Sequence, residues 1–492
     1  VTNNIKVTQT AGDNLVAIYA KDLDFTNAAV ADIEILGDSI GIYGENSTIA
    51  NSATINVKGE NSVGIYLKGS TLASIGTING DPATTSAPKI GVYVENGSDI
   101  TDTGDYNFGI QGGVGMYLED SVVAYSGTIH VTGDSTSAAR TIGTYVDKDI
   151  IGNLDMNIDV TGKDAIGMYL NGDTTMGANI TYNGDLSITS SSTTSGIGIY
   201  LGENSTFTLG NGTSVTIGGT NNIGFYVSQG STFNMAGGTV QNTADGIFAY
   251  IVNGNMTFAT GNTPSIDYAN IVLEGGTFTN DTTITLGTVG LIGQNGATIT
   301  NTTNGIINGT VDGGRGLIGK DAGTSVVNDG KINLTGKNSV GMYVIGGASG
   351  TSTGEVRVGE EGVAYYVGPS NTMNISGTGY VGEKGAVIYN EGGTVNYTGS
   401  GLEASDNATE IILTDISETV NMNNTDRNVG KKGTGIYVNG TAEVNNVQTL
   451  NGINVGEEGT GIYADITSAT NTSHNISLNG KGSIGILATN TG

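Results

Sequence analysis

The six residues Ser62-Val63-Gly64-Ile65-Tyr66-Leu67 carry the pattern that decides the fold. The phrase, small or polar–apolar–Gly–apolar–Tyr–apolar, returns as Lys89-Ile90-Gly91-Val92-Tyr93-Val94 and in many further copies. Its tyrosine occupies positions 19, 43, 66, 93, 117, 145, 169, 200, 226, 250, 343, 366, 389, 437 and 463. Copies without tyrosine are predicted at 271–273, 289–292, 316–318, 411–413 and 484–487. About twenty copies, spaced by roughly 25 residues, indicate a repeat architecture.

Within the phrase, apolar residues alternate in the way expected of a strand. Val63, Ile65 and Leu67 are separated by Gly64 and Tyr66, which is a period of two residues. We therefore expect the aliphatic side chains to face a core. Gly64 and Tyr66 should face outward, with each tyrosine ring covering a neighbouring glycine. A stacking platform for sugars is the alternative interpretation of the tyrosines.

Two more strand-like pieces follow the phrase in most repeats, for example at 47–50 and 53–57, and Gly, Asn, Asp or Ser separate them. Three short strands and three turns predict one coil of a right-handed parallel β-helix. The fold class is therefore all-β, with about twenty coils stacked at the inter-strand spacing. We expect residues 1–492 to form a single elongated domain cut from a longer rod, because neither end shows a polar capping coil.

Composition excludes several classes of function. The 492 residues include 82 Gly, 4 Pro and no Cys or Trp, and the net charge is −28. Such an acidic chain has no electrostatic means of neutralising phosphates, so nucleic acid is not an expected partner. Without cysteine there are no disulfides, zinc–thiolate sites or thiol nucleophiles. No stretch approaches the length of a transmembrane helix.

A ladder of Asn and Asp is expected at one corner of the coil, five positions before the tyrosine. Both residue types tolerate the left-handed backbone conformation and hydrogen-bond their own backbone. A metal-binding role for these acids is the alternative, and binding of calcium at the acidic edges is left open. The members are Asn14, Asp38, Asn61, Asp164, Asn221, Asp245 and Asn338.

Departures from the repeat predict loops, where binding residues concentrate. Insertions are predicted near 81–89, 101–113, 132–140, 189–196 and 396–432. Three of them, 81–89, 132–140 and 189–196, precede a tyrosine strand and should leave the same corner. Solvated loops without function are the alternative. The predicted partner-binding residues are Asp81, Lys89, Tyr106, Phe108 and Arg140.

Catalysis has little support. His130 and His474 lie about fourteen coils apart and belong to different sites. A triad of His130 with Ser135 is left open, although no Gly-Asp-Ser-Gly sequence supplies a nucleophile. The pairs Glu360-Glu361 and Glu457-Glu458 precede tyrosine strands and are interpreted as a solvated edge. We expect no enzyme, no catalytic residue, no cofactor and no metal.

The Gly–apolar–Tyr phrase with Asn/Ser/Thr-rich turns resembles the passenger of a monomeric (type Va) autotransporter, and most closely the large fusobacterial outer-membrane adhesins of the RadD-like and galactose-binding types. The resemblance implies a monomeric rod at the cell surface that binds host-cell receptors, glycans or other bacteria. It also implies anchoring in the outer membrane through a C-terminal barrel outside this sequence. A spacer segment of a longer adhesin and a hydrolase-type passenger are the alternatives.

Overall fold

The computed structural model describes residues 1–492 except 88, 191–194, 220, 260–264, 400, 416–417, 423–425, 441, 444–445, 449, 466–474 and 490–492. The chain forms two compact units, built mainly from residues 1–256 and 267–492. The described residues contain strands and turns but no α-helix. No helix in the described part is long and apolar enough to cross a membrane.

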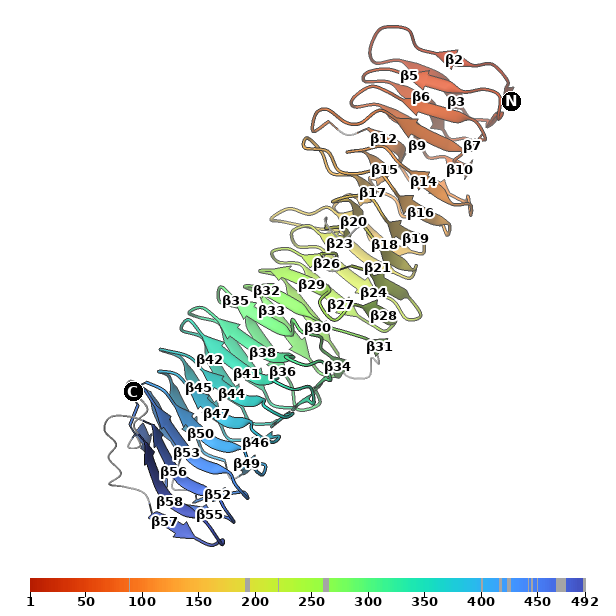
Figure 1. Cartoon of the computed structure of the whole chain (residues 1–492). Coiled ribbons are helices and arrows are strands. Elements are labelled where there is room, and N and C mark those ends of the chain that lie inside the picture. The colour runs from red at the N-terminus through yellow and green to blue at the C-terminus, as the bar shows by residue number, and fades with distance from the viewer. Residues whose placement is uncertain are drawn as a thin grey trace. The chain divides into compact units, whose positions relative to one another are not determined.

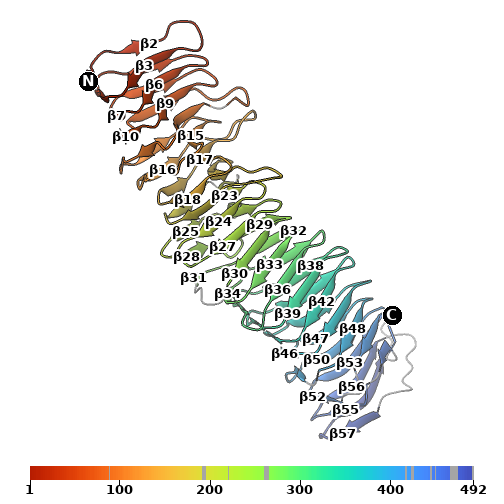
Figure 2. The same cartoon turned by 180° about the vertical axis from the view of Figure 1, so that it is seen from behind.

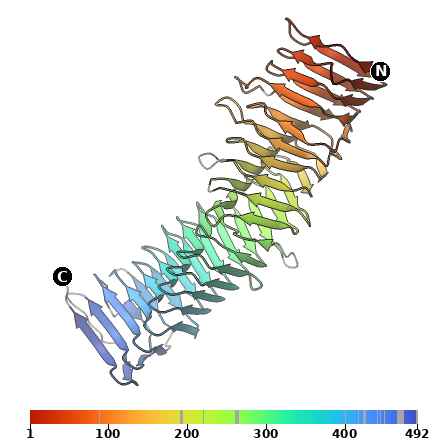
Figure 3. The same ribbon diagram turned by 45° about the vertical axis from the view of Figure 1, so that its right-hand side comes forward.

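Each unit is a parallel β-helix in which strands of successive coils pair on three faces (Figure 1). The predicted fold class is confirmed: the chain is an all-β parallel solenoid of about 19 turns. Figures 2 and 3 show the strands of each unit lying side by side in successive layers. The right-handed sense of the coil and the single elongated domain stay predictions.

Unit 1 contains ten of the fifteen tyrosine phrases. Its first face, which carries them, consists of β3 (Val16–Lys21), β6 (Ile40–Glu45), β9 (Val63–Lys68), β12 (Ile90–Glu95), β15 (Val114–Leu118), β17 (Ile142–Val146), β20 (Ile166–Leu170), β23 (Ile197–Leu201), β26 (Ile223–Val227) and β29 (Ile247–Val252). Its second face consists of β1 (Thr2–Asn3), β4 (Asp24–Asn27), β7 (Thr48–Asn51), β10 (Thr71–Ser74) and β13 (Asp99–Ile100), then β18 (Ile151–Leu154), β21 (Asn179–Tyr182), β24 (Thr206–Leu209) and β27 (Thr232–Met235). Its third face consists of β2 (Val7–Thr8), β5 (Ile33–Ile35), β8 (Thr54–Val57) and β11 (Thr77–Gly80), then β14 (Tyr106–Phe108), β16 (Thr128–Val131), β19 (Asn157–Val160), β22 (Leu186–Ile188), β25 (Ser214–Ile217), β28 (Thr239–Asn242) and β31 (Ser265–Ile266). Strand β30 (Asn255–Phe258) includes the unit boundary.

Unit 2 repeats the arrangement. Its first face consists of β32 (Ile271–Glu274), β35 (Leu291–Gln294), β38 (Arg315–Lys320), β41 (Val340–Ile345), β44 (Val363–Val367), β47 (Ala386–Asn390), β50 (Thr409–Leu413), β53 (Thr434–Asn439), β56 (Thr460–Asp465) and β58 (Ile484–Thr489). Its second face consists of β33 (Thr277–Asn280), β36 (Thr298–Asn301), β39 (Ser325–Asn328), β42 (Ser349–Ser352), β45 (Thr372–Ile375), β48 (Thr394–Tyr397), β51 (Thr419–Asn421) and β54 (Val447–Gln448). Its third face consists of β34 (Thr283–Thr285), β37 (Ile306–Gly309), β40 (Lys331–Leu334), β43 (Glu355–Val358), β46 (Thr378–Val381) and β49 (Gly401–Ala404), then β52 (Asp426–Val429), β55 (Gly452–Val455) and β57 (Asn475–Leu478).

The register of the first face confirms the predicted tyrosine alignment. In unit 1 each tyrosine from Tyr19 to Tyr250 pairs with the tyrosine of the next coil. In unit 2 the copies without tyrosine fall in the same line, since Val272, Ile292 and Ile318 lead to Tyr343. The phrase therefore marks one position of the coil throughout.

The predicted outward direction of the glycine is wrong. A Cβ on Gly64 would lie 3.2 Å from the buried side chain of Ile78 and 2.7 Å from the carbonyl oxygen of Gly91, so Gly64 faces the interior. Val63 instead packs beside Tyr66. Two consecutive residues, Gly64 and Ile65, thus face inward, and the strict two-residue alternation fails at this point. Any residue larger than glycine at this position places its side chain inside the coil.

Asparagines form hydrogen-bonded rows inside the coil where the second strand ends. In unit 2, Asn280 Nδ2 donates to Asn301 Oδ1 at 2.8 Å, and Asn301 Nδ2 donates to Asn328 Oδ1 at 2.8 Å. All three residues are fully buried. Each side-chain amide hydrogen-bonds to the amide of the next coil, so the buried polar groups of this row are paired.

The predicted corner ladder is confirmed at five positions, which have φ between 47° and 59°: Asn14, Asp38, Asn61, Asp164 and Asn338. In unit 2 the same corner also holds Glu361, Lys432 and Glu458 with positive φ. Ion pairs link this corner between coils, including Lys337–Glu360 at 2.7 Å and Lys431–Glu457 at 3.2 Å. The two glutamate pairs therefore belong to a solvated, charge-paired edge, as interpreted from the sequence.

Candidate functional site

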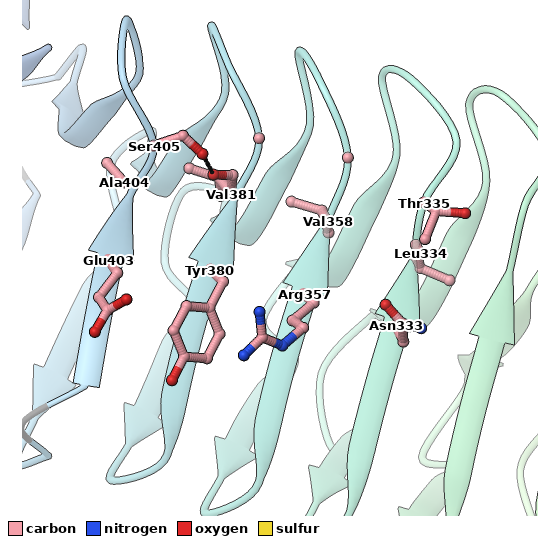
Figure 4. A pocket seen from close by; sticks show the side chains of 12 residues that line it. Asn333, Leu334, Thr335, Arg357, Val358, Tyr380, Val381, Glu403, Ala404 and Ser405 are labelled. Atoms are coloured by element: carbon pink, nitrogen blue, oxygen red, sulfur yellow. Dashed lines mark hydrogen bonds between the residues drawn. The ribbon is translucent and has the colours of Figure 1, made fainter. Parts of the chain in front are cut away.

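The outer side of the third face of unit 2 carries a row of chemically varied side chains. Asn333, Arg357, Tyr380 and Glu403 occupy equivalent positions of β40, β43, β46 and β49. They alternate with buried residues such as Val356 in each strand, which directs them to solvent. Figure 4 shows the four side chains projecting to the same side from successive strands.

This row borders a shallow groove of about 390 Å³, whose far side is formed by the turn residues that follow the strands, including Thr335 and Ser405. The Arg357 guanidinium carbon lies 3.8 Å from the Tyr380 ring centroid, a cation–π contact. Arg357 Nε also donates to Glu355 Oε1 at 2.8 Å, and this hydrogen bond raises the pKa of Arg357. The Arg357 guanidinium is thus held by the Glu355 carboxylate and the Tyr380 ring at the edge of the groove.

The groove offers a balanced set of donors and acceptors. Arginine supplies only donors, a carboxylate such as Glu403 supplies only acceptors, and the Asn333 amide and Tyr380 hydroxyl supply both. Tyr380 adds an apolar ring surface. Such a set suits a neutral, polar ligand or a peptide segment, because no single sign of charge dominates it.

None of these four residues is among the predicted partner contacts. The signal that identifies them is their spacing, since each lies one coil after the previous one. Tyr380 is also a tyrosine outside the repeated phrase, and Arg357 is one of only 18 cationic residues. The sequence pattern alone does not say which of the three faces they occupy.

The prediction of Lys89 as an exposed partner contact is wrong. Its side chain is buried, with 1 % of the residue exposed. Its ammonium group donates to the carbonyl oxygens of Lys58, Asp81 and Pro82 and lies 3.8 Å from Glu60 Oε1. Lys89 therefore holds the 81–89 loop against the coil stack instead of presenting a charge to a partner.

Tyr106 and Phe108 are also not surface residues. They form β14, pair with Ile129 and Val131 of the next coil, and are 1 % and 0 % exposed. The predicted 101–113 loop is therefore a coil with a regular third strand, and its aromatic rings belong to the core. The strand is only three residues long and has polar neighbours on both sides, so its alternation is not evident from the sequence.

Asp81 and Arg140 are exposed, and their role as partner contacts stays a prediction. The 81–89 and 132–140 segments precede β12 and β17, so both leave the same corner, as predicted. Segment 189–196 precedes β23 in the same way, although residues 191–194 lie outside the described structure. Backbone bonds between coils, such as Ala83 N to Gln111 O at 2.8 Å, tie this edge together.

His130 and Ser135 have separate partners. His130 Nδ1 lies 3.2 Å from Asp159 Oδ2, and Nε2 lies 3.7 Å from Asp105 Oδ2. The Ser135 hydroxyl donates to Asp164 O at 2.7 Å and accepts from Thr141 N. The structure thus brings His130 to two carboxylates and not to the serine. His474 lies outside the described residues. Among those described, no three His, Cys, Asp or Glu side chains are grouped to hold a metal ion.

The predicted 396–432 loop is wrong for the residues that the structure describes, because they contribute strands β48 to β52 of the coil. Residues 400, 416–417 and 423–425 of this segment lie outside the described structure. What departs from the repeat is the pairing: the third-face sheets end at β49 and begin again at β52. Two buried side chains span this interruption. Arg427 Nη2 donates to Glu410 Oε2 at 2.6 Å and to Leu402 O, and Ala404 N donates to Glu410 Oε1 at 3.1 Å.

A second buried carboxyl lies nearby in the sequence. Glu418 is 2 % exposed and accepts a hydrogen bond from Thr414 N, and among the described residues its Oε1 atom has no hydrogen-bond partner. Burial raises the pKa of Glu418 from 4.5 to about 7. The carboxyl is therefore mostly neutral in weak acid and becomes charged inside the coil near neutral pH.

This raised pKa predicts a pH-dependent stability. The folded state holds the Glu418 proton more tightly than the unfolded chain does. The protonated carboxyl therefore contributes fully to the stability of the folded state below pH 4.5, and this contribution is lost as the pH rises to about 7. The difference in free energy of unfolding between Glu418→Gln and the wild type, measured by urea denaturation, should therefore shift by about 3 kcal/mol in favour of the variant between pH 4 and pH 8. The exposed Glu383→Gln serves as control. Parallel pH profiles for wild type and Glu418→Gln would contradict the assignment.

The tyrosines of the first face do not offer ring faces to a sugar. From Tyr43 to Tyr250 consecutive rings stack with interplanar angles of 6–18°. Each inner ring has both faces covered by its neighbours, so only ring edges reach solvent. The interpretation of this face as a sugar-stacking platform therefore loses its geometric basis.

Comparisons with known proteins add no assignment: no protein-family model matches the chain, and no curated protein matches its sequence.

Proposed function

We propose that this protein is an adhesin of the bacterial cell surface, a β-helical shaft that binds a receptor on host cells or other bacteria. The receptor is a glycan or a protein. The observation that supports this proposal is the groove of Asn333, Arg357, Tyr380 and Glu403, which combines an aromatic ring, a cation and a carboxylate on an otherwise regular wall. Tyr and Arg are the residues most often found to dominate binding energy at interfaces.

The mechanism is display of a modest site in many copies. A shallow groove of this size gives limited affinity for one receptor, and many chains on one cell raise the overall strength through multivalency. The net charge of −28 opposes close approach to acidic surfaces, so binding depends on local contacts at the groove. Attachment to the outer membrane and the monomeric state belong to the same proposal.

The test is binding of the isolated chain to intact host or bacterial cells. Replacing Arg357 and Tyr380 with alanine should weaken binding by about thirtyfold, as expected for loss of roughly 2 kcal/mol at a binding centre. Arg140→Ala is the matched control, because it removes an exposed arginine from the loop edge of unit 1. Periodate or protease treatment of the cells then distinguishes a glycan from a protein receptor.

Each outcome of this assay is informative. Loss of binding in Arg140→Ala but not in the groove variant would move the site to the loop edge. Absence of binding by the wild-type chain would contradict the adhesin proposal for this segment and favour a spacer. A groove variant that stays folded, as judged by circular dichroism, and binds cells as tightly as the wild type would show that the groove does not bind the receptor.

A further inference from the structure

The stacked tyrosines of unit 1 form a continuous aromatic column along the first face. The column consists of Tyr19, Tyr43, Tyr66, Tyr93, Tyr117, Tyr145, Tyr169, Tyr200, Tyr226 and Tyr250. Ring centroids of consecutive members lie 4.6–5.7 Å apart. Every inner ring therefore has a chemically identical ring on each side.

Packing holds the tyrosine rings in place but leaves them partly exposed to solvent. One side of Tyr66, Tyr93 and Tyr117 packs against the buried Val63 and its equivalents in the following coils. The rings themselves are only half-buried, so an edge of each remains open to solvent. An oxidant at the surface can reach the column, while the coil register keeps neighbouring rings in contact.

Acceptors for the phenolic protons are present beside the column. Tyr93 donates to Glu119 Oε2 at 2.8 Å, and Tyr19 donates to Glu45. In both cases the carboxylate comes from the next coil. Loss of an electron makes a phenol strongly acidic, and a carboxylate already in hydrogen-bond contact takes the released proton without rearrangement.

We propose that the tyrosine column is a site of oxidative modification, at which a haem peroxidase with hydrogen peroxide couples tyrosines of successive coils into dityrosine. Two neighbouring tyrosines each lose one electron and the phenolic proton. Their radicals form one carbon–carbon bond between ring positions ortho to the oxygens, and the two ring hydrogens at those positions shift to restore both hydroxyls. One hydrogen peroxide takes up the two electrons and two protons and becomes two waters.

Composition and charge favour coupling within one chain. The sequence has no Cys, whose thiol would otherwise compete for the oxidant. The net charge of −28 keeps separate chains apart. The preset ring contact gives neighbouring tyrosines a high effective concentration. Each cross-link closes a loop of one coil and so constrains the unfolded chain.

Two variants with equal tyrosine content test the proposal. The alternating variant replaces Tyr43, Tyr93, Tyr145, Tyr200 and Tyr250 with phenylalanine and leaves no adjacent tyrosine pair in the column. The block variant replaces Tyr19, Tyr43, Tyr66, Tyr93 and Tyr117 and leaves five consecutive tyrosines. Both retain ring stacking. Each protein is treated with horseradish peroxidase and hydrogen peroxide, and cross-linked peptides are mapped by mass spectrometry.

We expect wild type and block variant to give dityrosine peptides that join ladder neighbours, such as Tyr169 with Tyr200, and a monomeric product. The alternating variant should show about tenfold less dityrosine in residues 1–256. Cross-links that mainly join separate chains, or equal yields in the alternating and block variants, would overturn the proposal. Absence of dityrosine in the oxidised wild type would overturn it equally.

Discussion

Replacing Arg427 with methionine is expected to lower the free energy of unfolding by about 3 to 5 kcal/mol, because it leaves Glu410 buried without its counter-charge. Arg427 is 3 % exposed and Glu410 is 1 % exposed, so water does not replace the lost partner. Leu402 O loses its donor at the same time. Urea denaturation followed by circular dichroism measures the loss.

The paired substitution separates two roles of this ion pair. Glu410 occupies the inward position held by Val387 one coil earlier, and Arg427 occupies that of Ile453 one coil later. Glu410→Val with Arg427→Met therefore restores an apolar interior. If the pair also replaces the missing β49–β52 backbone bonds, the double variant should remain destabilised by about 1 to 3 kcal/mol. Full recovery of stability would show that the pair makes no such contribution.

The second large effect is expected at the buried asparagine row. Asn301→Leu removes the acceptor of Asn280 Nδ2 and the donors to Asn328 Oδ1 and Gly305 O. One N–H of Asn280 Nδ2 and the Asn328 Oδ1 atom then lie in the interior without partners, each at a cost of about 1 to 3 kcal/mol. The Gly305 carbonyl oxygen still accepts a hydrogen bond from Lys331 N. We expect the free energy of unfolding to fall by about 4 kcal/mol in total.

A matched exposed asparagine provides the control. Asn374 lies on the same face of unit 2, with its side chain outward, and accepts a hydrogen bond from Asn396 at 3.0 Å. Asn374→Leu should change the free energy of unfolding by less than about 0.5 kcal/mol. A similar loss of stability in Asn301→Leu and Asn374→Leu would contradict a special role for the buried row.

The repeat made the fold predictable from the sequence. The phrase around Tyr66 fixed the coil length, and its degenerate copies, such as Ile411-Ile412-Leu413, fell into the same register. The left-handed corner was also predictable, because Asn61 and its equivalents are residue types that tolerate positive φ. Local backbone chemistry and stacking were sufficient for these features.

Side-chain burial was less predictable where it depends on three-dimensional neighbours. Lys89 is predicted to be a partner contact because cations are rare in this acidic chain, yet three carbonyl oxygens bind its ammonium group in the interior. Tyr106 and Phe108 lie in a strand too short to reveal its period against polar neighbours. Gly64 and Ile65 both face the interior, although they are consecutive. The two-residue alternation of a strand does not predict such a pair.

The groove illustrates the same limit for the candidate site. Arg357, Tyr380 and Glu403 recur at the coil spacing, but their common direction depends on which face the third strand occupies and how it alternates. The Glu410–Arg427 pair is unexpected for a different reason: both residues occupy positions that other coils fill with apolar or small side chains.

Equivalent positions of successive coils lie one strand spacing apart in this fold, and a distance between two spin labels measures this spacing in unit 2. Thr300 and Asn396 lie on the second face of unit 2, four coils apart. The chain has no native cysteine, so cysteines at these two positions can be labelled selectively. Pulsed electron paramagnetic resonance should give one narrow distribution near about 19 Å, allowing for label length. A broad distribution, or one centred far beyond that distance, would contradict the coil stack.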